Sequence, residues 1–208
     1  MSGGYSIRYL MKRIELLCFM LLLLAISMAY SGMAAAKPII VIAVTVNMLF
    51  YLITGIGLTR NTFLPSAWKH TQTELRPALI MKTSSGIVFA FTMLAIAFNE
   101  LFIYGLTALS ISAVILLTAV MFFAMKLLED DQPKLTRGII VRSAILSIAL
   151  TFYIVTPLST RLAWRFDDVY YREMLQYALE NPNDEDAQRD LLDYEMRMEG
   201  QVPFEPLE

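Results

Sequence analysis

Apolar residues occur in five long stretches that are separated by short polar connectors. The clearest two lie between Arg76 and Lys126, running from Ile87 to Phe98 and from Leu101 to Met125, with a polar break at Asn99-Glu100. Each arm has about 20 residues between its flanks, which at about 1.5 Å per residue crosses a hydrocarbon core of about 30 Å. The pattern predicts a transmembrane helical hairpin with both ends on one side of a membrane.

Three more apolar stretches predict three more spans. They run from Ile14 to about Ala36, from Pro38 to about Leu58, and from Gly138 to Pro157. The first has an alternative interpretation, because its basic start and the small residues at its end are also typical of a secretory signal peptide. We favour a retained helix, because cleavage after Ala36 would leave Lys37-Pro38 as a terminus directly abutting another span. Residues 1–157 are therefore expected to form a five-span bundle.

Basic residues alternate between the two sides of this bundle. They are frequent before the first span and in the second and fourth connectors, and scarce in the first and third, so the N-terminus is expected in the cytoplasm. Five spans then place the C-terminus outside the cytoplasm, and we expect a bacterial inner (cytoplasmic) membrane. Arg161 and Arg165 follow the fifth span and weaken the pattern there. The residues on the basic side are Arg8, Lys12, Arg13, Arg60, Lys69, Arg76, Lys82, Lys126, Lys134, Arg137 and Arg142.

The first two predicted hairpins resemble each other in sequence. Shifting the chain by 70 positions places Met11-Lys12 on Met81-Lys82 and Leu24-Ala25-Ile26 on Leu94-Ala95-Ile96. Apolar helices also match by chance, because they share a small set of residue types. The common register of the basic starts and the connectors favours tandem hairpin repeats at about 11–58 and 78–125, in parallel orientation.

The composition changes at residue 158, where an acidic tail begins. Apolar residues at helical spacing predict a short pair of amphipathic helices in 158–208, the first ending at Asn181-Pro182 and the second capped by Asn183. The stretch from Tyr177 to Asp184 resembles the junction between tetratricopeptide units, although a true array needs several units of about 34 residues. Two short helices bury little alone. Their apolar faces are expected to pack either on the bundle or on a protein partner.

Composition supports a membrane protein and leaves little room for catalysis. Of the 208 residues 57% are hydrophobic, the mean hydropathy is +0.55 and the net charge is −2, which is too apolar for a soluble domain of this size. The single cysteine, Cys18, cannot form an internal disulfide, and His70 is the only histidine. We find no motif for a nucleophile, a metal site or a phosphate loop. We therefore expect no enzyme activity, no catalytic, cofactor-binding or metal-binding residues, no cofactor and no nucleic-acid partner.

The expected function is that of a non-catalytic accessory or assembly subunit of a membrane complex. A small oligomeric transporter or channel is the alternative, and the oligomeric state is left open. Asn47, near mid-span, is expected to face another helix or to contact a ligand, because an unpaired amide is costly in hydrocarbon. Glu100 is expected to pair with Arg161 or Arg165, or else to cap a turn in headgroup water. Glu15 is expected to interact with Arg13 or with water.

Overall fold

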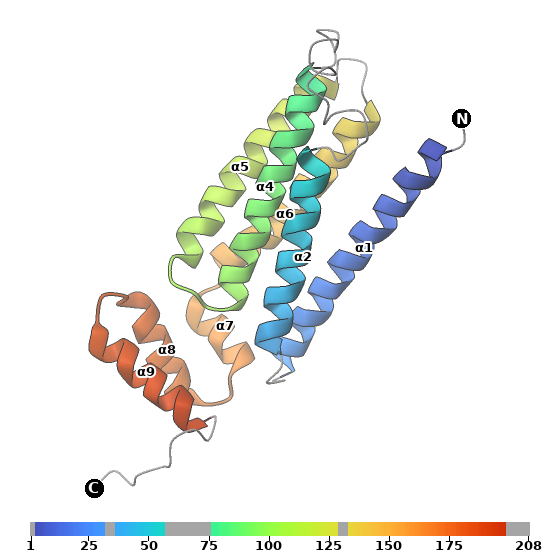
Figure 1. Ribbon diagram of the computed structural model, residues 1–208. Coiled ribbons are helices and arrows are strands. Elements are labelled where there is room, and N and C mark those ends of the chain that lie inside the picture. The colour runs from blue at the N-terminus through green and yellow to red at the C-terminus, as the bar shows by residue number, and fades with distance from the viewer. Residues whose placement is uncertain (1–2, 32–35, 57–75, 129–132, 199–208) are drawn as a thin grey trace, which may run out of the picture.

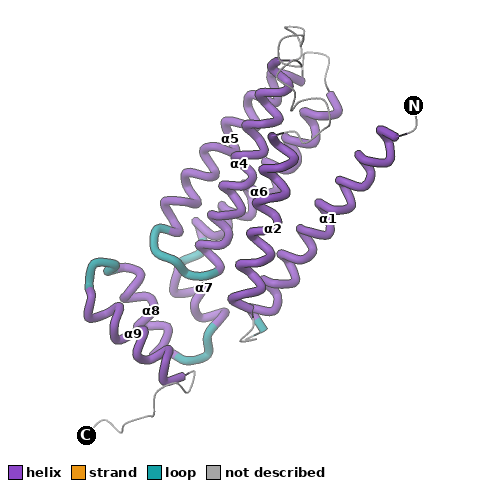
Figure 2. The backbone as a smooth tube through the Cα atoms, in the orientation of Figure 1, coloured by secondary structure: helices purple, strands orange, loops and turns teal. Residues whose placement is uncertain are grey.

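A computed structural model of the chain describes residues 3–31, 36–56, 76–128 and 133–198, and these residues form eight helices and no strand (Figure 2). The predicted all-helical class is therefore confirmed. The helices are α1 (Gly3–Tyr30), α2 (Ala36–Ile56), α4 (Arg76–Glu100), α5 (Leu106–Leu128), α6 (Pro133–Val155), α7 (Leu158–Arg165), α8 (Val169–Glu180) and α9 (Glu185–Met198).

Five of these helices, α1, α2, α4, α5 and α6, are long and apolar enough to cross a membrane. They correspond to the five stretches predicted from the sequence. The connectors at 57–75 and 129–132, which carry part of the predicted charge alternation and include His70, lie outside the described residues. The hairpins α1–α2 and α4–α5 run in the same order along the bundle (Figure 1), and their superposition as a parallel repeat stays a prediction.

Helix α4 forms the centre of the bundle. It packs against α2, α5 and α6, and 61% of its apolar window is buried, compared with 22–33% for the other four long helices. Small side chains such as Ala90, Ala95 and Ala97 are buried along it, and small residues let neighbouring helices approach closely. Ala25 and Ala29 have the same role where α1 packs on α2.

The two ends of the bundle differ. Helices α7, α8 and α9 gather at one end, opposite the N-terminus (Figure 1). We name this the tail end. Helices α1, α4 and α6 finish at the tail end, whereas α2 and α5 begin there (Figure 1). The carbonyl ends of three helices therefore face the tail, and each carries a partial negative charge.

Most polar side chains between the two ends bond to their own helix. Thr45, Thr92 and Thr118 each donate to the carbonyl four residues earlier, at 2.7–2.8 Å. Asn47 differs, because its amide nitrogen donates at 2.8 Å both to Ala43 on its own helix and to the carbonyl of Cys18 on α1. The prediction that Asn47 faces another helix is confirmed.

Replacing Asn47 with leucine is expected to lower the free energy of unfolding by about 0.6–1.7 kcal/mol, the usual range for a hydrogen bond between helices in a membrane protein. The loss should come from the contact between α1 and α2, and it can be measured by denaturant titration in detergent. Thr45→Val is the matched control, because Thr45 is exposed and bonds only within α2. Equal effects of both substitutions would contradict the structural role of Asn47.

The tail contains three helices where the sequence predicted two. The first predicted helix breaks at residues 166–168, because Phe166 is extended and the Asp168 carboxylate accepts from the Tyr171 amide at 3.1 Å, starting a new helix. The predicted cap of the last helix was also wrong. Asp184, rather than Asn183, accepts from the Ala187 amide at 3.1 Å. The end of α8 at Asn181 is as predicted.

Candidate functional site at the tail end

The polar break Asn99-Glu100 lies at the centre of a buried group of side chains. Asn99 and Glu100 are each 1% exposed and Arg161 is 3% exposed, while the Arg165 side chain is 4% exposed. Such burial is rare for charged residues unless they are paired. We name this group the tail-end cluster; its members, from α4, α5, α6 and α7, are Asn99, Glu100, Ser110, Tyr153, Arg161 and Arg165.

The Glu100 carboxylate is held from two sides. The Tyr153 hydroxyl of α6 donates to one oxygen, and Arg165 Nη1 of α7 lies 3.3 Å from the other. The same Arg165 nitrogen also donates to the backbone carbonyl of Glu100, so it caps the end of α4 as well as pairing with the side chain. The predicted pairing of Glu100 with Arg165 is confirmed.

Arg161 is held differently. Its Nη1 donates to Asn99 Oδ1 at 2.8 Å, and Asn99 Nδ2 in turn donates to Ser110 Oγ at 2.7 Å. The guanidinium also lies 5.7 Å from the centre of the Tyr153 ring. Among the described residues no acceptor reaches its Nε. Arg161 therefore links α7 to α4 and α5 through amide and hydroxyl groups, and Arg165 makes the stronger, charged contact.

The cluster holds two guanidinium groups and one carboxylate. The ends of α1, α4 and α6 meet here, and their terminal carbonyls provide further negative partial charge. Burial lowers the pKa of Arg161, but arginine has so high an ordinary pKa that it stays protonated. Arg161 is thus held by neutral groups and Arg165 by the Glu100 carboxylate, so that together they clamp α7 onto α4.

The loop between α4 and α5 inserts a phenylalanine into the tail. Phe102 is buried against Leu162 and Leu175, and Arg165 lies 5.3 Å from the centre of its ring. Its φ of 51° is in the left-handed region, which costs an L-residue about 1–2 kcal/mol. Such a conformation persists only where surrounding contacts enforce it. Sequence reasoning missed Phe102; the available signal was an aromatic residue in a short connector.

Further contacts hold α8 and α9 in place. The Tyr171 hydroxyl donates to Glu195 at 2.6 Å, and Lys37 at the start of α2 lies 3.6 Å from the same carboxylate. The Tyr194 hydroxyl donates to Asp168 at 2.5 Å and holds the pKa of that carboxyl below its usual range. The inner face of the tail is therefore packed on the bundle, as one of the two alternatives predicted.

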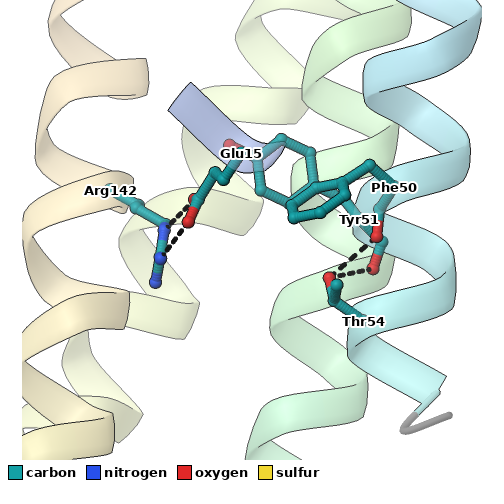
Figure 3. A network of polar contacts seen from close by, with 5 residues as sticks. All are labelled: Glu15, Phe50, Tyr51, Thr54 and Arg142. Atoms are coloured by element: carbon teal, nitrogen blue, oxygen red, sulfur yellow. Dashed lines mark hydrogen bonds and ion pairs between the residues drawn. The ribbon is translucent and has the colours of Figure 1, made fainter. Parts of the chain in front are cut away.

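A second ion pair joins the middle parts of the first and last long helices. Arg142 of α6 donates to both oxygens of Glu15 of α1, with Nη2 at 2.5 Å from Oε2 (Figure 3). The Tyr51 ring lies beside Glu15 in the same view, and Thr54 donates to the carbonyls of Phe50 and Tyr51. The expectation that Glu15 interacts with Arg13 or water missed this partner, which is 127 residues away.

Arg142→Gln is expected to destabilise the protein by about 1–3 kcal/mol, because it removes a bidentate charged contact and leaves Glu15 without its guanidinium. Both side chains are partly exposed, so the effect should be smaller than that of breaking a fully buried pair. Denaturant titration in detergent measures it. Arg137→Gln, at an exposed position five residues earlier on α6, should change little; a similar loss for both would contradict a specific pair.

The structure separates the four candidate residues into two places. Glu100, Arg161 and Arg165 belong to the tail-end cluster, whereas Asn47 lies in the α1–α2 contact. No group of three or more histidine, cysteine or acidic residues that could hold a metal occurs within the described residues. We found no match for the chain among protein-family models, curated proteins or solved structures.

Proposed function

We propose that this is an integral membrane protein that acts as a non-catalytic accessory or assembly subunit of a membrane complex and presents residues 158–198 to a partner. Large apolar side chains on all five long helices point outward, among them Leu17, Ile42, Ile115 and Ile148. Exposed apolar surface of this extent is stable only against lipid or other helices. Membrane insertion explains it most simply.

The observation that carries the proposal is the clamp on the tail. A buried ion pair between Glu100 and Arg165, together with the buried Phe102, fixes α7 and thereby α8 at the end of the bundle. Desolvating charged groups costs several kcal/mol for each ion. A tail that could move freely relative to the bundle would not require a buried ion pair to hold it. The clamp therefore supports a role in which the tail is held ready for contact.

The interior of the bundle supports a binding role more than transport. The charged side chains Lys82, Glu100 and Lys126 lie near helix ends, whereas Glu15 and Arg142 lie nearer the middle of α1 and α6 and are ion-paired with each other. Thr92 and Asn47 use their hydrogen-bond donors on helix carbonyls. Transport paths generally need polar or ionisable groups that are available along a pore. The transporter alternative has no such support among these residues.

Extraction in mild detergent followed by native mass measurement tests the proposal. We expect the intact chain to be recovered with discrete proteins in fixed stoichiometry. The variant Arg165→Gln, which weakens the clamp, should lose them, whereas the control Arg137→Gln should keep them. Recovery of a homo-oligomer with no other protein would contradict the subunit role and favour a pore.

The proposed topology places the N-terminus in the cytoplasm and the tail on the other side. In a Cys18→Ser background, a cysteine introduced at Ser2 should react with an impermeant maleimide only after permeabilisation, because the positive-inside rule retains that end. A cysteine at Gln201 should react in intact cells. The opposite result at either position would overturn the topology.

A further inference from the structure

The outer side of α8 and α9 combines exposed aromatic rings with carboxylates. Tyr170 and Tyr177 are 60% and 54% exposed, and Leu192 on α9 is also exposed. Along α8, Tyr170, Glu173 and Tyr177 follow one another at spacings of three and four residues, so they share one stripe. The buried residues Leu175 and Ala178 of α8 lie elsewhere on the helix. We name as the acidic–aromatic face a set of exposed residues on these two helices, on which Arg189 of α9 is the one exposed cation: Tyr170, Glu173, Tyr177, Asp186, Asp190, Leu192 and Asp193.

The charge of this region differs sharply from that of the rest of the chain. Residues 158–208 contain 13 acidic and 5 basic residues, whereas residues 1–157 contain 6 acidic and 12 basic ones. Two of the five tail arginines, Arg161 and Arg165, are buried in the tail-end cluster. The remaining surface is strongly negative and is repelled by anionic lipid headgroups. A positively charged partner is the complementary one.

The face is also held in a fixed geometry. Ring contacts connect Tyr170 to Tyr194 at 5.4 Å, Tyr194 to Tyr171 at 6.1 Å and Tyr171 to Phe166 at 5.0 Å. Phe166 then contacts the buried Phe102 at 5.8 Å. An unbroken series of rings thus joins the exposed surface to the clamp. Binding to such a preordered surface loses less conformational entropy than binding to a loose chain end.

We propose that the acidic–aromatic face binds an arginine- and lysine-rich segment of a protein partner on the same side of the membrane. The inference rests on the proposed function and names the chemistry of the partner. Tyrosine rings attract guanidinium and ammonium groups through cation–π contacts, and neighbouring carboxylates pair with the same groups. Tyrosine is also enriched among residues that dominate binding at protein interfaces. Tyr170 and Tyr177 are the expected anchors, and Glu173 lies between them on α8.

Site-specific photocrosslinking in cells that express the full chain tests the inference. A benzophenone amino acid at position 170 or 177 should give a discrete protein adduct, and mass spectrometry should place the crosslink in a partner segment with net positive charge. Trp164 is the matched control, because it is 52% exposed but belongs to α7 and stacks on Phe152 of α6. The charge-reversal pair Glu173→Lys and Asp186→Lys, both at exposed positions, should reduce the adduct at least tenfold.

Several results would overturn the inference. These are adducts with lipid or with a second copy of this chain, a crosslinked segment that is neutral or acidic, an adduct insensitive to charge reversal, or an equal adduct from position 164. The absence of any adduct would overturn it too. If partners still co-purify with the intact protein in any of these cases, the subunit role stands and only this binding face is wrong.

Discussion

Arg165→Gln is expected to destabilise the protein by about 3–5 kcal/mol, the usual cost of leaving one member of a buried ion pair without its partner. The Glu100 carboxylate would keep the Tyr153 hydroxyl but lose its charged contact, in a place where its side chain is 1% exposed. The backbone carbonyl of Glu100 would also lose the donor that caps α4. Denaturant titration of the protein in detergent measures the loss.

A double-mutant cycle separates the pair from its surroundings. Glu100→Gln and Arg165→Gln together should cost clearly less than the sum of the two single changes, because the second change removes the group that the first left unpaired. The same cycle with Arg161→Gln should show weaker coupling, since Arg161 bonds to Asn99. Additive effects for both arginines would contradict the clamp and leave Glu100 as a simple cap of its helix.

The sequence predicted the long helices well because their signal is local. A stretch of about 20 uncharged and predominantly apolar residues identifies a helix such as α5 without reference to anything else in the chain. The Glu100–Arg165 pair was also within reach, because the number of spans places both residues at the same end of the bundle. The contact of Asn47 with another helix was predictable too, because a side-chain amide at mid-span needs a hydrogen-bond acceptor.

Other contacts could not be predicted because they depend on how distant helices pack. Glu15 and Arg142 are 127 residues apart, and only the position of α1 relative to α6 makes them neighbours. The break between α7 and α8 was missed for a different reason. The apolar spacing continues across the break. Asp168, which caps α8, is also compatible with an exposed position inside one continuous helix. Helix packing determined the partner of Glu15, and capping by Asp168 determined the break between α7 and α8. The sequence pattern did not distinguish either outcome from its alternative.

Phe102→Ala is expected to weaken the docking of the tail by about 3–5 kcal/mol, as truncation of a buried phenylalanine usually does. The side chain fills the space between Leu162 and Leu175, and its ring faces the Arg165 guanidinium. The loss should appear as faster hydrogen exchange of the α8 and α9 amides, with the exchange of α4 and α5 little changed. Ile103→Ala is the matched control in the same loop, because Ile103 is exposed.

Phe102→Gly is expected to cost less than Phe102→Ala, by about 1 kcal/mol, which reverses the usual order for these two residues. Both variants lose the ring, but only glycine adopts the φ of 51° at this position without strain. Alanine keeps the backbone cost that the phenylalanine packing no longer offsets. If glycine proved the more damaging of the two, the loop would not hold its left-handed conformation after the ring is removed. The ring itself would then be what shapes the connector between α4 and α5.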